Sequence, residues 1–596
     1  MTKLSPIEKL QLLKSAKTLH DVAAFLNFKP HTLSYVLYKK PDGAKYKKFE
    51  IPKRHGGTRQ ISAPLDDLKV LQRNLATFLQ DCVETINETN GLADQIAHGF
   101  KRKRSIITNA RPHRNHRFVF NLDLSDFFGT INFGRVRGFF MKDTNFALDK
   151  KVATILAQIA CFESKLPQGS PCSPVISNLI GHVLDIHLVR LAAKTGCSYT
   201  RYADDLTFST NQPVFPIDIA KTTGDRHTWV PGDKLKWLIK KNGFEINPKK
   251  TRMQYYDSRQ EVTGLVVNRK LNVRSEYRHK VRAMVHHLLT TGKFDFIYKL
   301  TDAAGIESKQ VLPGKLDQLH GMLGFINGVD LYNRKLLDQN PFNHPKRATE
   351  KLSTKETMYL RFLLFKVFFA ADKPVIICEG KTDNVYLTHA IRGLANVFPQ
   401  LAAKNPDGTI TINVRIFRYV NKSTGRIFGN SSGGAAGLSK LMRHYHTEWK
   451  KFKAPGGKQP MIFLVDNDSG ATDKGKIYGT IADLTNKPKP TGHEKFIHVS
   501  GNMYVVPTPL TGKATSSCIE DFFYKATKEI PYLGKAFDPK CLKDTATHFG
   551  KATFAFEVIK PNAGSINFSK FKRLLKSLVG VIDYHTKTHP PLKAVP

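Results

Sequence analysis

The sequence predicts a multidomain protein of combined α/β and α+β fold class. Its 596 residues are enough for about four domains at roughly 150 residues each. In the first half, strand patterns that end in carboxylates are separated by helical patterns, whereas beyond residue 373 short apolar runs alternate with helical ones. The expected segments are 1–45, 46–272, 273–335, 336–372 and 373–596.

The first segment, residues 1–45, is expected to be helical. Thr18 can cap a helix whose apolar residues follow at helical spacing. The next stretch, Ile51–Arg59, predicts two strands around a Gly-Gly turn, which would place Lys53 and Arg59 as a cationic clamp over bound phosphates. An exposed basic hairpin has the same pattern, so both interpretations stay open.

Two adjacent carboxylates, Asp204 and Asp205, lie between apolar strand patterns. A tight turn between two strands would hold them at its tip, where they can bind a divalent cation. A third acid, Asp123, ends another buried-strand pattern about eighty residues upstream. Three such carboxylates suit two metal ions about 4 Å apart, which activate a 3′-hydroxyl and hold a triphosphate. The pattern predicts the palm of a nucleic-acid polymerase, although an isolated Asp-Asp pair would be an ordinary polar turn.

The order of these blocks, from about residue 45 to about residue 330, resembles that of reverse transcriptases. Between the acidic strands, a proline-rich loop, Leu166–Pro174, leads into an apolar helix pattern. The resemblance implies right-hand fingers and palm over 46–272, and an RNA-directed DNA polymerase with two Mg²⁺ ions in the palm. It implies a triad that is both catalytic and metal-binding: Asp123, Asp204 and Asp205.

The same resemblance implies a site for deoxynucleoside triphosphates (dNTPs). Its residues would be Lys53, Arg59, Phe128 and Gln168. Phe128 would crowd a ribose 2′-hydroxyl and so favour deoxynucleotides. One of two adjacent lysines would lie near the leaving pyrophosphate as a further catalytic residue. The family pattern favours Lys250, and Lys249 stays open.

Two further blocks resemble signatures of retron reverse transcriptases, one just before the first acidic strand and one after the lysine pair. The resemblance implies RNA-binding roles for five of their residues: Asn109, His113, Val262, Thr263 and Gly264. It also implies that the enzyme folds on its own structured non-coding RNA and starts DNA synthesis from a guanosine 2′-hydroxyl in it. The branched RNA-linked DNA product (msDNA) would stay bound, with a homo-oligomer as one arrangement.

Each of these two blocks also has an ordinary interpretation. Alone, His113 would be a packed or surface histidine without a function, and Val-Thr-Gly would be a common strand end. An intron-type reverse transcriptase would share the palm and remains an alternative, although neither block is expected of it.

Two apolar-periodic stretches, Glu276–Thr291 and Lys315–Val329, predict helices. They suit a helical thumb over 273–335 that holds an RNA stem. The periodicity then stops in Asn333–Lys355, where an Asn-Pro and a His-Pro step break it. The interruption predicts a linker over 336–372.

Beyond residue 373, two apolar runs end in acids. Pro374–Cys378 is followed by Glu379 and a helical pattern, and Met461–Val465 is followed by Asp466 and Asp468. Strands that alternate with helices and carry acids at their C-terminal ends predict a Rossmann-like parallel sheet with a metal site at its carboxyl edge.

This arrangement resembles the Toprim domain of topoisomerases, primases and nucleases of the overcoming-lysogenization-defect type. The resemblance implies Mg²⁺ or Mn²⁺ and catalytic, metal-binding roles for Glu379 as general acid/base and for Asp466 and Asp468 as ligands. Glu520 would hold a second metal ion or cap a helix. For 373–596 the Toprim resemblance implies a nuclease. The resemblance to retron systems implies that this domain is an effector in antiphage defence, restrained by the polymerase and msDNA. Its target, RNA, tRNA or DNA, stays open, as does a non-catalytic binding module.

Composition agrees with nucleic-acid partners. The formal net charge is +42, from 92 basic and 50 acidic residues, which fits a large phosphate footprint. Neither a long apolar run nor a signal peptide is evident, so no membrane partner is expected. Seven scattered cysteines without Cys-x-x-Cys spacing favour reduced thiols and a cytoplasmic location.

Overall fold

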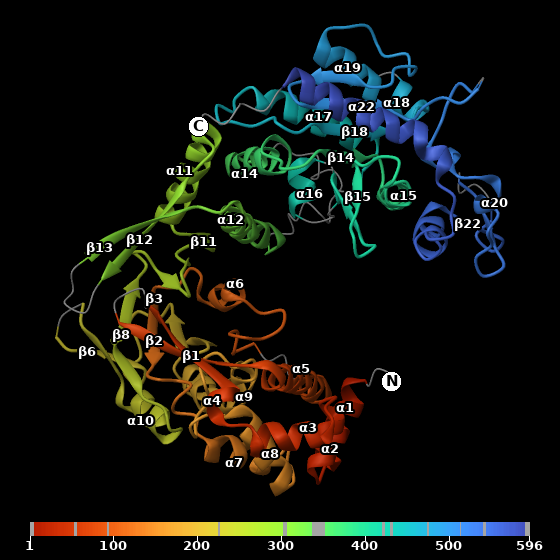
Figure 1. Ribbon diagram of the computed structural model, residues 1–596. Helices are drawn as coiled ribbons and strands as arrows, with labels where there is room; N and C mark the ends of the chain where they lie inside the picture. The colour runs from red at the N-terminus through yellow and green to blue at the C-terminus, as the bar shows by residue number, and fades with distance from the viewer. Residues whose placement is uncertain are drawn as a thin grey trace. The chain divides into compact units, whose positions relative to one another are not determined.

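The chain forms two compact units, which Figure 1 draws in red to yellow and in green to blue. Unit 1 comprises Met1–Ser275 with Ile297–Gln310, and unit 2 comprises Glu276–Phe296 with Val311–Pro596. The predicted start of the thumb, at residue 273, lies close to the first of these divisions. The computed structural model describes residues 5–52, 57–91, 95–224, 227–301, 307–336, 352–419, 423–429, 433–473, 476–512, 514–539 and 544–589.

The N-terminal part of unit 1 is helical, as predicted. It contains α1 (Pro6–Ser15), α2 (Leu19–Phe25) and α3 (Pro30–Ser34). Thr18 caps α2, because its hydroxyl accepts a hydrogen bond of 3.2 Å from the Asp21 N–H. The Asp21 carboxylate accepts one of 2.9 Å from the Thr18 N–H in return, which completes a capping box.

The predicted basic hairpin is also present. β1 (Tyr46–Pro52) and β2 (Thr58–Pro64) pair antiparallel, with Arg59 opposite Ile51. Lys53, in the connection between these strands, lies outside the described residues.

A four-stranded antiparallel sheet, here called the palm sheet, forms the centre of unit 1. Its strands are β3 (Phe118–Leu124), β4 (Ser198–Tyr202), β5 (Asp205–Thr210) and β8 (Ile246–Tyr255). Their order is β4-β5-β3-β8, so the two acidic strands β3 and β5 are neighbours. The predicted strands on both sides of the Asp-Asp pair are confirmed, and the turn between β4 and β5 spans only residues 203 and 204.

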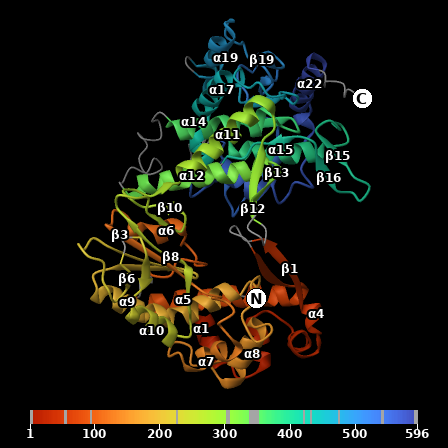
Figure 2. The same ribbon diagram turned by 90° about the vertical axis from the view of Figure 1, so that its left-hand side faces the viewer.

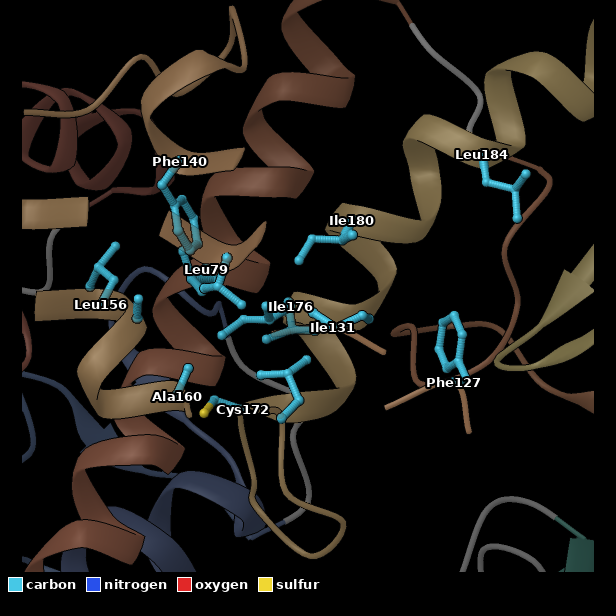
Figure 3. Close-up of a cluster of buried hydrophobic side chains, with 14 of the residues drawn as sticks. Leu79, Phe127, Ile131, Phe140, Leu156, Ala160, Cys172, Ile176, Ile180 and Leu184 are labelled. Carbon is cyan, nitrogen blue, oxygen red and sulfur yellow. The ribbon is translucent and has the colours of Figure 1, made fainter. Parts of the chain in front are cut away.

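Helices beside the palm sheet enclose an apolar core. In Figure 3, Leu79, Phe140, Leu156 and Ile176 point toward one another from four different helices, and each of the four is 0% exposed. The helix after the proline-rich loop was predicted from its apolar spacing. The four helices are α5 (Asp66–Thr89), α7 (Phe133–Lys142), α8 (Lys150–Ala160) and α9 (Ser173–Lys194).

Among the described residues, α9 alone is long and apolar enough to cross a membrane when length and composition are the only criteria. However, 67% of its most apolar window is buried inside the structure, which is the setting of a core helix. The remaining elements of unit 1 are η1 (Tyr35–Lys39), α4 (Asp42–Lys45), α6 (Ile106–Ala110), η2 (Arg111–His113), β6 (Ala220–Thr222), β7 (Trp229–Pro231), α10 (Asp233–Lys241), β9 (Glu261–Val262), β10 (Leu265–Val266) and β11 (Asn272–Val273).

Unit 2 contains a five-stranded sheet. In sheet order its strands are β17 (Arg415–Ile416), β14 (Val375–Cys378), β18 (Met461–Val465), β20 (Met503–Pro507) and β19 (Ile497–Ser500). The first four are parallel, as predicted for the two acid-bearing strands. β19 departs from the prediction and runs antiparallel to β20. The reason is the short connection through Gly501 and Asn502, because a parallel pair needs a long crossover.

Both faces of this sheet are buried, as in a doubly wound fold. Ile376, Ile462 and Tyr504 belong to one core, on the face covered by three helical segments. Their neighbours along the strands, Ile377 and Phe463, are 0% exposed on the opposite face. The three segments of the first core are α15 (Lys381–Gly393), η5 (Phe554–Ile559) and α22 (Lys572–Thr588).

The two predicted thumb helices are present as α11 (Ser275–Thr291) and α12 (Leu316–Leu336), and both pack within unit 2. The backbone N–H groups of Lys453 and Ala454 donate to the carbonyl of Leu289, near the end of α11, at 3.0 and 3.1 Å. The thumb prediction is therefore confirmed for the helices, but they form one compact unit with the C-terminal sheet.

The predicted linker, 336–372, is helical where the structure describes it. It contains α14 (Thr354–Leu364) and η3 (Phe365–Phe369), and α14 packs against α12, as Figure 2 shows. Ser353 and Glu356 form a capping box at the start of α14. The segment predicted as a linker therefore contains a helix, and its Ser-x-x-Glu sequence is the local signal for the start of that helix.

The following are the other elements that the structure describes. They are β12 (Asp295–Thr301), β13 (Glu307–Pro313), β15 (Ala402–Lys404), β16 (Ile410–Ile412), α16 (Ser423–Phe428), α17 (Ala435–Trp449), α18 (Ser469–Thr472), α19 (Ile477–Thr485), η4 (Ile519–Phe522), α20 (Lys525–Lys528), β21 (Ala536–Phe537), β22 (His548–Phe549), α21 (Lys551–Thr553) and η6 (Ser569–Phe571).

Candidate active sites

The end of the palm sheet brings the three predicted acids of unit 1 together. Asp123 on β3 lies directly opposite Asp205, the first residue of β5. Asp204 lies in the turn just before β5, and its carbonyl accepts a hydrogen bond of 3.0 Å from the Leu124 N–H. Ala203, at the start of this turn, has a φ of +57°, which directs the chain sharply back along the next strand. Three carboxylates therefore face one small region.

A buried ion pair supports the backbone beneath this turn. The Arg201 side chain is 0% exposed, and its Nη2 lies 2.7 Å from Asp185 Oδ2 on α9. Arg201 Nη1 also donates to the carbonyl of Ala203 at 3.1 Å. A Cβ at Gly181 would lie 2.9 Å from this guanidinium, so a glycine is required for the close approach. Sequence reasoning missed this pair, although an arginine inside a strand and an aspartate inside an apolar helix each need a partner.

The grouping of the acids changes their proton affinity. Desolvation, together with the charges of Asp204 and Asp123, raises the pKa of Asp205 to about 7. Desolvation and the charge of Asp123 also raise the pKa of Asp204. The cluster thus holds more negative charge than its surroundings neutralise, and a bound divalent cation would relieve it. A strongly perturbed carboxylate pair in a cleft is typical of a functional site.

A cleft of about 590 Å³ opens in front of these acids. Asp123 and Asp204 line one side of it. The predicted nucleotide-binding residues that the structure describes line it too: Arg59, Phe128 and Gln168. The structure therefore brings these residues into one cleft, and their part in nucleotide binding stays a prediction.

The loop before α9 is held against the basic hairpin. The N–H of Ser62 on β2 donates to the carbonyl of Gln168 at 2.8 Å. The next residue, Gly169, has a φ of +120°, and a Cβ there would lie 2.9 Å from the Ser62 carbonyl oxygen. This close contact explains why a glycine follows Gln168 and fixes that residue beside the cleft.

Lys250, rather than Lys249, lies beside the acids. Its Nζ is 2.9 Å from Asp123 Oδ2. Desolvation lowers the pKa of Lys250, but the hydrogen bond and charge interaction with Asp123 outweigh it, so the net shift is upward. Lys250 lines both the cleft and a second cavity of about 1080 Å³, and Lys249 lines the second cavity. This geometry agrees with the family preference for Lys250.

The residues predicted to bind RNA form a packed junction, and three of them do not reach the surface. Asn109, His113 and Val262 are each 0% exposed. His113 Nδ1 lies 2.7 Å from Ser209 Oγ, and its Nε2 lies 2.8 Å from Thr200 Oγ1. Burial lowers the pKa of His113 to about 3, so the ring is neutral. Direct RNA contact by these three residues is therefore corrected to a structural role, because their side chains are enclosed.

The other two predicted RNA-binding residues lie at the surface of the same junction. Thr263 and Gly264 have φ values of +45° and +82° and form the two-residue turn between β9 and β10. Thr263 Oγ1 donates to the carbonyl of Ile106 on α6 at 3.4 Å. Both residues line the 1080 Å³ cavity, together with Lys250 and Asp205. The two retron-like blocks are thus in contact, and RNA binding by this turn stays a prediction.

In unit 2 the predicted acids follow the carboxyl ends of adjacent parallel strands, as expected. The N–H of Asp466 donates to Glu379 Oε2 at 3.4 Å. Asp468 caps α18 by accepting a hydrogen bond of 2.7 Å from the Gly470 N–H. A Cβ at Gly470 would lie 2.8 Å from Asp468 Oδ1 and 3.8 Å from Glu379 Oε1. The three carboxylates therefore border one small region at the edge of the sheet.

Glu520 belongs to this region and is 1% exposed. The helix-capping interpretation is not supported, because Asp521 accepts the hydrogen bond of 2.9 Å from the Cys518 N–H that a cap requires. Lys551 pairs with both carboxylate oxygens of Glu520, at 3.0 and 3.1 Å. Metal binding by Glu520 stays a prediction.

Two residues of this site, Asp383 and Lys551, were not predicted from the sequence. Asp383 is 7% exposed, and its carboxylate accepts a hydrogen bond of 2.7 Å from the Gly380 N–H. Desolvation and the charges of Asp383, Glu520 and Glu379 raise the pKa of Asp466 to about 9, while Lys551 opposes them. The available signal was the spacing of Asp383, four residues after Glu379, at the start of the predicted helix.

Both acidic sites have the chemistry that Mg²⁺ prefers. Among the described residues, no group of three His, Cys, Asp or Glu side chains is already arranged closely enough to hold a metal ion. The donors are nevertheless carboxylate oxygens, and desolvation together with their mutual repulsion raises the pKa of Asp205 and of Asp466. The residues are therefore of the type that holds divalent cations.

Comparison with known proteins identifies the polymerase part. Residues 51–282 match the family described as reverse transcriptase (RNA-dependent DNA polymerase). The Retron Mx65 reverse transcriptase of Myxococcus xanthus is 34% identical over 290 residues, which cover 45% of this chain and 62% of that protein. Apo telomerase from Candida tropicalis, truncated from its C-terminal domain, aligns over 40% of this chain and 56% of that one at 14% identity, with a TM-score of 0.26.

A second relative extends over most of its own length. The Retron Ec86 reverse transcriptase of Escherichia coli is 31% identical over 322 residues, which cover 54% of this chain and 87% of that protein. By contrast, the chain spans somewhat less than two thirds of the Mx65 protein. Together with the acid cluster, the cleft and the packed junction of unit 1, this similarity shows that the chain belongs to the retron reverse transcriptase family.

Proposed function

We propose that the protein is an RNA-directed DNA polymerase that makes msDNA, a branched RNA-linked single-stranded DNA, from its own structured non-coding RNA. The observation that carries this proposal is the position of Asp123 opposite Asp205, with Asp204 in the adjoining turn, at the head of a cleft. The names of the related proteins, which are retron reverse transcriptases, support it.

In this proposal the three acids hold two Mg²⁺ ions, which supply the charge that activates the attacking hydroxyl and stabilises the transferred phosphate. Arg59 and Lys250 line the same cleft and offer their charges to the triphosphate. Phe128 and Gln168 border the sugar of the incoming dNTP. Phe128 packs edge-on against Phe127 at 5.5 Å between ring centroids, so its position is fixed when it excludes a 2′-hydroxyl.

For unit 2 we propose a Toprim-like nuclease effector that hydrolyses a nucleic-acid phosphodiester with Mg²⁺ or Mn²⁺. Glu379, Asp466 and Asp468 would hold the cations, with Glu520 and Asp383 contributing to a second position. Two observations support this assignment: the parallel sheet with acids at its carboxyl edge, and the raised pKa of Asp466. In this proposal the protein is cytoplasmic and acts in antiphage defence. Its polymerase part and msDNA restrain the effector, either in a single chain or in a homo-oligomer.

The first experiment isolates the protein from cells with its nucleic acid. We expect the extracted nucleic acid to contain both RNA and DNA, because the product joins the two through a 2′ branch. Ribonuclease should therefore leave the DNA part, and deoxyribonuclease should leave the RNA part. An extract that either enzyme removes completely would contradict msDNA synthesis. An intron-type enzyme would instead copy an unrelated primed RNA equally well and leave no branched product.

The second experiment tests the effector with RNA, tRNA and single- and double-stranded DNA as separate substrates. We expect one of them to be cleaved, with cleavage stopped by a chelator and restored by Mg²⁺ or Mn²⁺. Retention of a substrate without cleavage under any metal condition would instead favour the non-catalytic binding module.

A further inference from the structure

A cleft of about 710 Å³ lies beside the free edge of the sheet in unit 2. β17 is the outermost strand on this side, because the sheet order places β14 on only one side of it. The lining comes from η3, the two residues at 372 and 373 before β14, one face of α15, the end of β16 and the residues around β17. None of the acids assigned to the hydrolytic site lines this cleft, so it is a separate feature of the unit.

The charge of the lining is strongly unbalanced. Four of its residues are cationic, and one, Asp372, is acidic. The cationic residues are Lys373, Arg392, Arg415 and Arg418, of which the three arginines are exposed. Several guanidinium groups around one opening attract phosphate, because each can donate two parallel hydrogen bonds to it.

Two of these cations are fixed by the surrounding backbone. Lys373 Nζ donates to the carbonyl of Ile412 at 3.2 Å. The guanidinium of Arg415 donates to the carbonyl of Val367. Groups that are already ordered lose little rotamer freedom when a ligand binds, so they favour binding.

The floor of the cleft is aromatic and apolar. Phe417 is half-buried, and its ring packs against Phe368, Tyr419 and Phe428 at 5.6, 5.6 and 5.7 Å between centroids, so these contacts fix its position in the lining. The Phe417 carbonyl accepts a hydrogen bond of 2.9 Å from Asn384 Nδ2, which holds this part of the chain in place. Val367 and Val414 add apolar surface to the lining. A floor of this kind suits the face of a nucleobase rather than a small inorganic anion.

The strand itself adds a polar group at the open edge. The N–H groups of Arg415 and Phe417 donate to β14, to the carbonyls of Pro374 and Ile376, both at 2.8 Å. Because alternate residues of a strand direct their N–H groups to opposite sides, the N–H of Ile416 points away from β14 toward the cleft. Backbone N–H groups beside arginines are a common setting for a phosphate.

We propose that this cleft binds a single-stranded segment of nucleic acid, with phosphates on Arg392, Arg415 and Arg418 and a base against Phe417. Cationic grooves with an aromatic platform are the usual solution for binding single strands without reading their sequence. The strand comes either from the nucleic acid that the protein carries or from a separate molecule, since both have the same chemistry. The proposal concerns binding alone and stands whether or not Glu379 supports hydrolysis.

The test compares two full-length double variants of equal charge change. Arg392→Glu with Arg418→Glu reverses two charges of the cleft, and Lys576→Glu with Lys587→Glu reverses two exposed charges on α22. Thermal unfolding with unchanged midpoints establishes that each variant is folded. In one arm the protein is cross-linked by ultraviolet light with the nucleic acid it carries, and in the other it is first stripped with nucleases and mixed with oligonucleotides of about ten nucleotides.

We expect peptides containing Phe417 to carry cross-linked nucleotides in at least one arm, and the cleft variant to lose them while the α22 variant keeps them. In the stripped arm, oligonucleotide affinity should fall roughly tenfold or more in the cleft variant, and the slope of log affinity against log salt should decrease by about 1.4 for two lost phosphate contacts. Cross-links in the first arm alone identify the carried strand as the ligand, and cross-links in the second identify a separate one. Three results would overturn the proposal. They are an absence of cross-links at Phe417 in both arms, an equal loss of oligonucleotide affinity in the two variants, and displacement of the oligonucleotide by an acidic peptide at the same concentration as by a competing oligonucleotide.

Discussion

In unit 1 the metal-binding carboxylates proposed for the polymerase lie at the turn of an antiparallel hairpin, whereas in unit 2 their counterparts follow parallel strands. The two clusters contain the same functional group, yet the pKa of Asp205 is raised to about 7 and that of Asp466 to about 9. Asp466 is surrounded by Asp383, Glu520 and Glu379, and a single lysine opposes them. The comparison shows that the number of neighbouring acids and the degree of enclosure, not the residue type, set how firmly each site holds a proton.

The largest effect is expected from Asp204→Asn with Asp205→Asn. Neutral amides cannot hold two cations against a triphosphate, so DNA synthesis should fall about a thousandfold or more, which corresponds to several kcal/mol of transition-state stabilisation. Primer extension on a generic primed RNA measures the loss, and Glu88→Gln on the exposed end of α5 is the matched control. DNA extension by the double variant at the normal rate would disprove the polymerase site.

Glu379→Ala should have an equally large effect on the other unit only. Hydrolysis and phage protection should be lost, while primer extension and the bound RNA–DNA product remain, because the two acid clusters lie in separate units. Glu557→Ala, at an exposed position of η5, should leave both activities intact. If protection persists without Glu379, the binding module becomes the better description of unit 2.

Arg201→Ala should destabilise unit 1 by about 3–5 kcal/mol, because Asp185 would remain buried without its partner. Arg201→Met with Asp185→Leu should restore most of the thermal stability, since no unpaired charge remains. If Arg201 positions the turn at Ala203, the stable double variant should still show a lowered kcat at nearly unchanged KM. Recovery of a normal kcat along with stability would show that the pair has a structural role only.

The pH dependence of stability should reveal the protonated cluster in unit 2. The pKa of Asp466 in the folded state, about 9, lies above the ordinary value of about 3.9. Its contribution to stability is therefore complete below pH about 4 and is lost as the pH rises toward 9, because the folded state keeps the proton longer. In chelator, the difference in melting temperature between Asp466→Asn and the unchanged protein should grow in favour of the variant across this range, and Asp483→Asn on the exposed face of α19 should show no such trend.

The smallest effect is expected from Thr263→Ala in the turn between β9 and β10. It removes a hydrogen bond of 3.4 Å to Ile106 and should cost less than about 1 kcal/mol of stability. Synthesis on the protein's own RNA should nevertheless fall more than synthesis on a generic primed template. Equal decreases on both templates would count against recognition of RNA by this turn.

Sequence reasoning succeeded where short-range pattern and chemistry agree. Asp123 ended one apolar strand pattern, and Asp204 and Asp205 lay between two others. The strands and the turn at the Asp-Asp pair could be read locally, whereas the meeting of Asp123 with Asp205 followed from the resemblance to a polymerase palm. The same reasoning located Glu379 and Asp466 at one sheet edge, because parallel strands end on the same side. These predictions depended on the period of the side chains and on the position of the turns, which a single sequence contains.

Long-range partners were beyond such reasoning. Nothing in the sequence joins Arg201 to Asp185 or Lys551 to Glu520, since each pair is defined only by packing. RNA binding by His113 was expected from the retron resemblance. Its hydroxyl partners, Ser209 and Thr200, lie 96 and 87 residues away in the sequence, so their packing around the ring could not be read from it. The helix α14 is a different case. Its capping box is a local signal in the sequence, but the two proline steps before it favoured the prediction of a linker.

The packing of α11 and α12 also limits how this chain can be divided. Asp330 on α12 pairs with Lys355 at 2.9 Å, and Asp317 pairs with Lys366 at 2.5 Å. Truncation at the predicted linker would therefore not release an intact polymerase, because it would expose the surface that α12 buries against α14 and leave Asp317 without Lys366 of η3. A usable shorter enzyme would need new polar residues on that surface. The end of α11 also hydrogen-bonds to Lys453 and Ala454, so a new junction after Phe369 would break a second set of contacts within the same unit. A different partner domain joined there would have to replace these contacts as well.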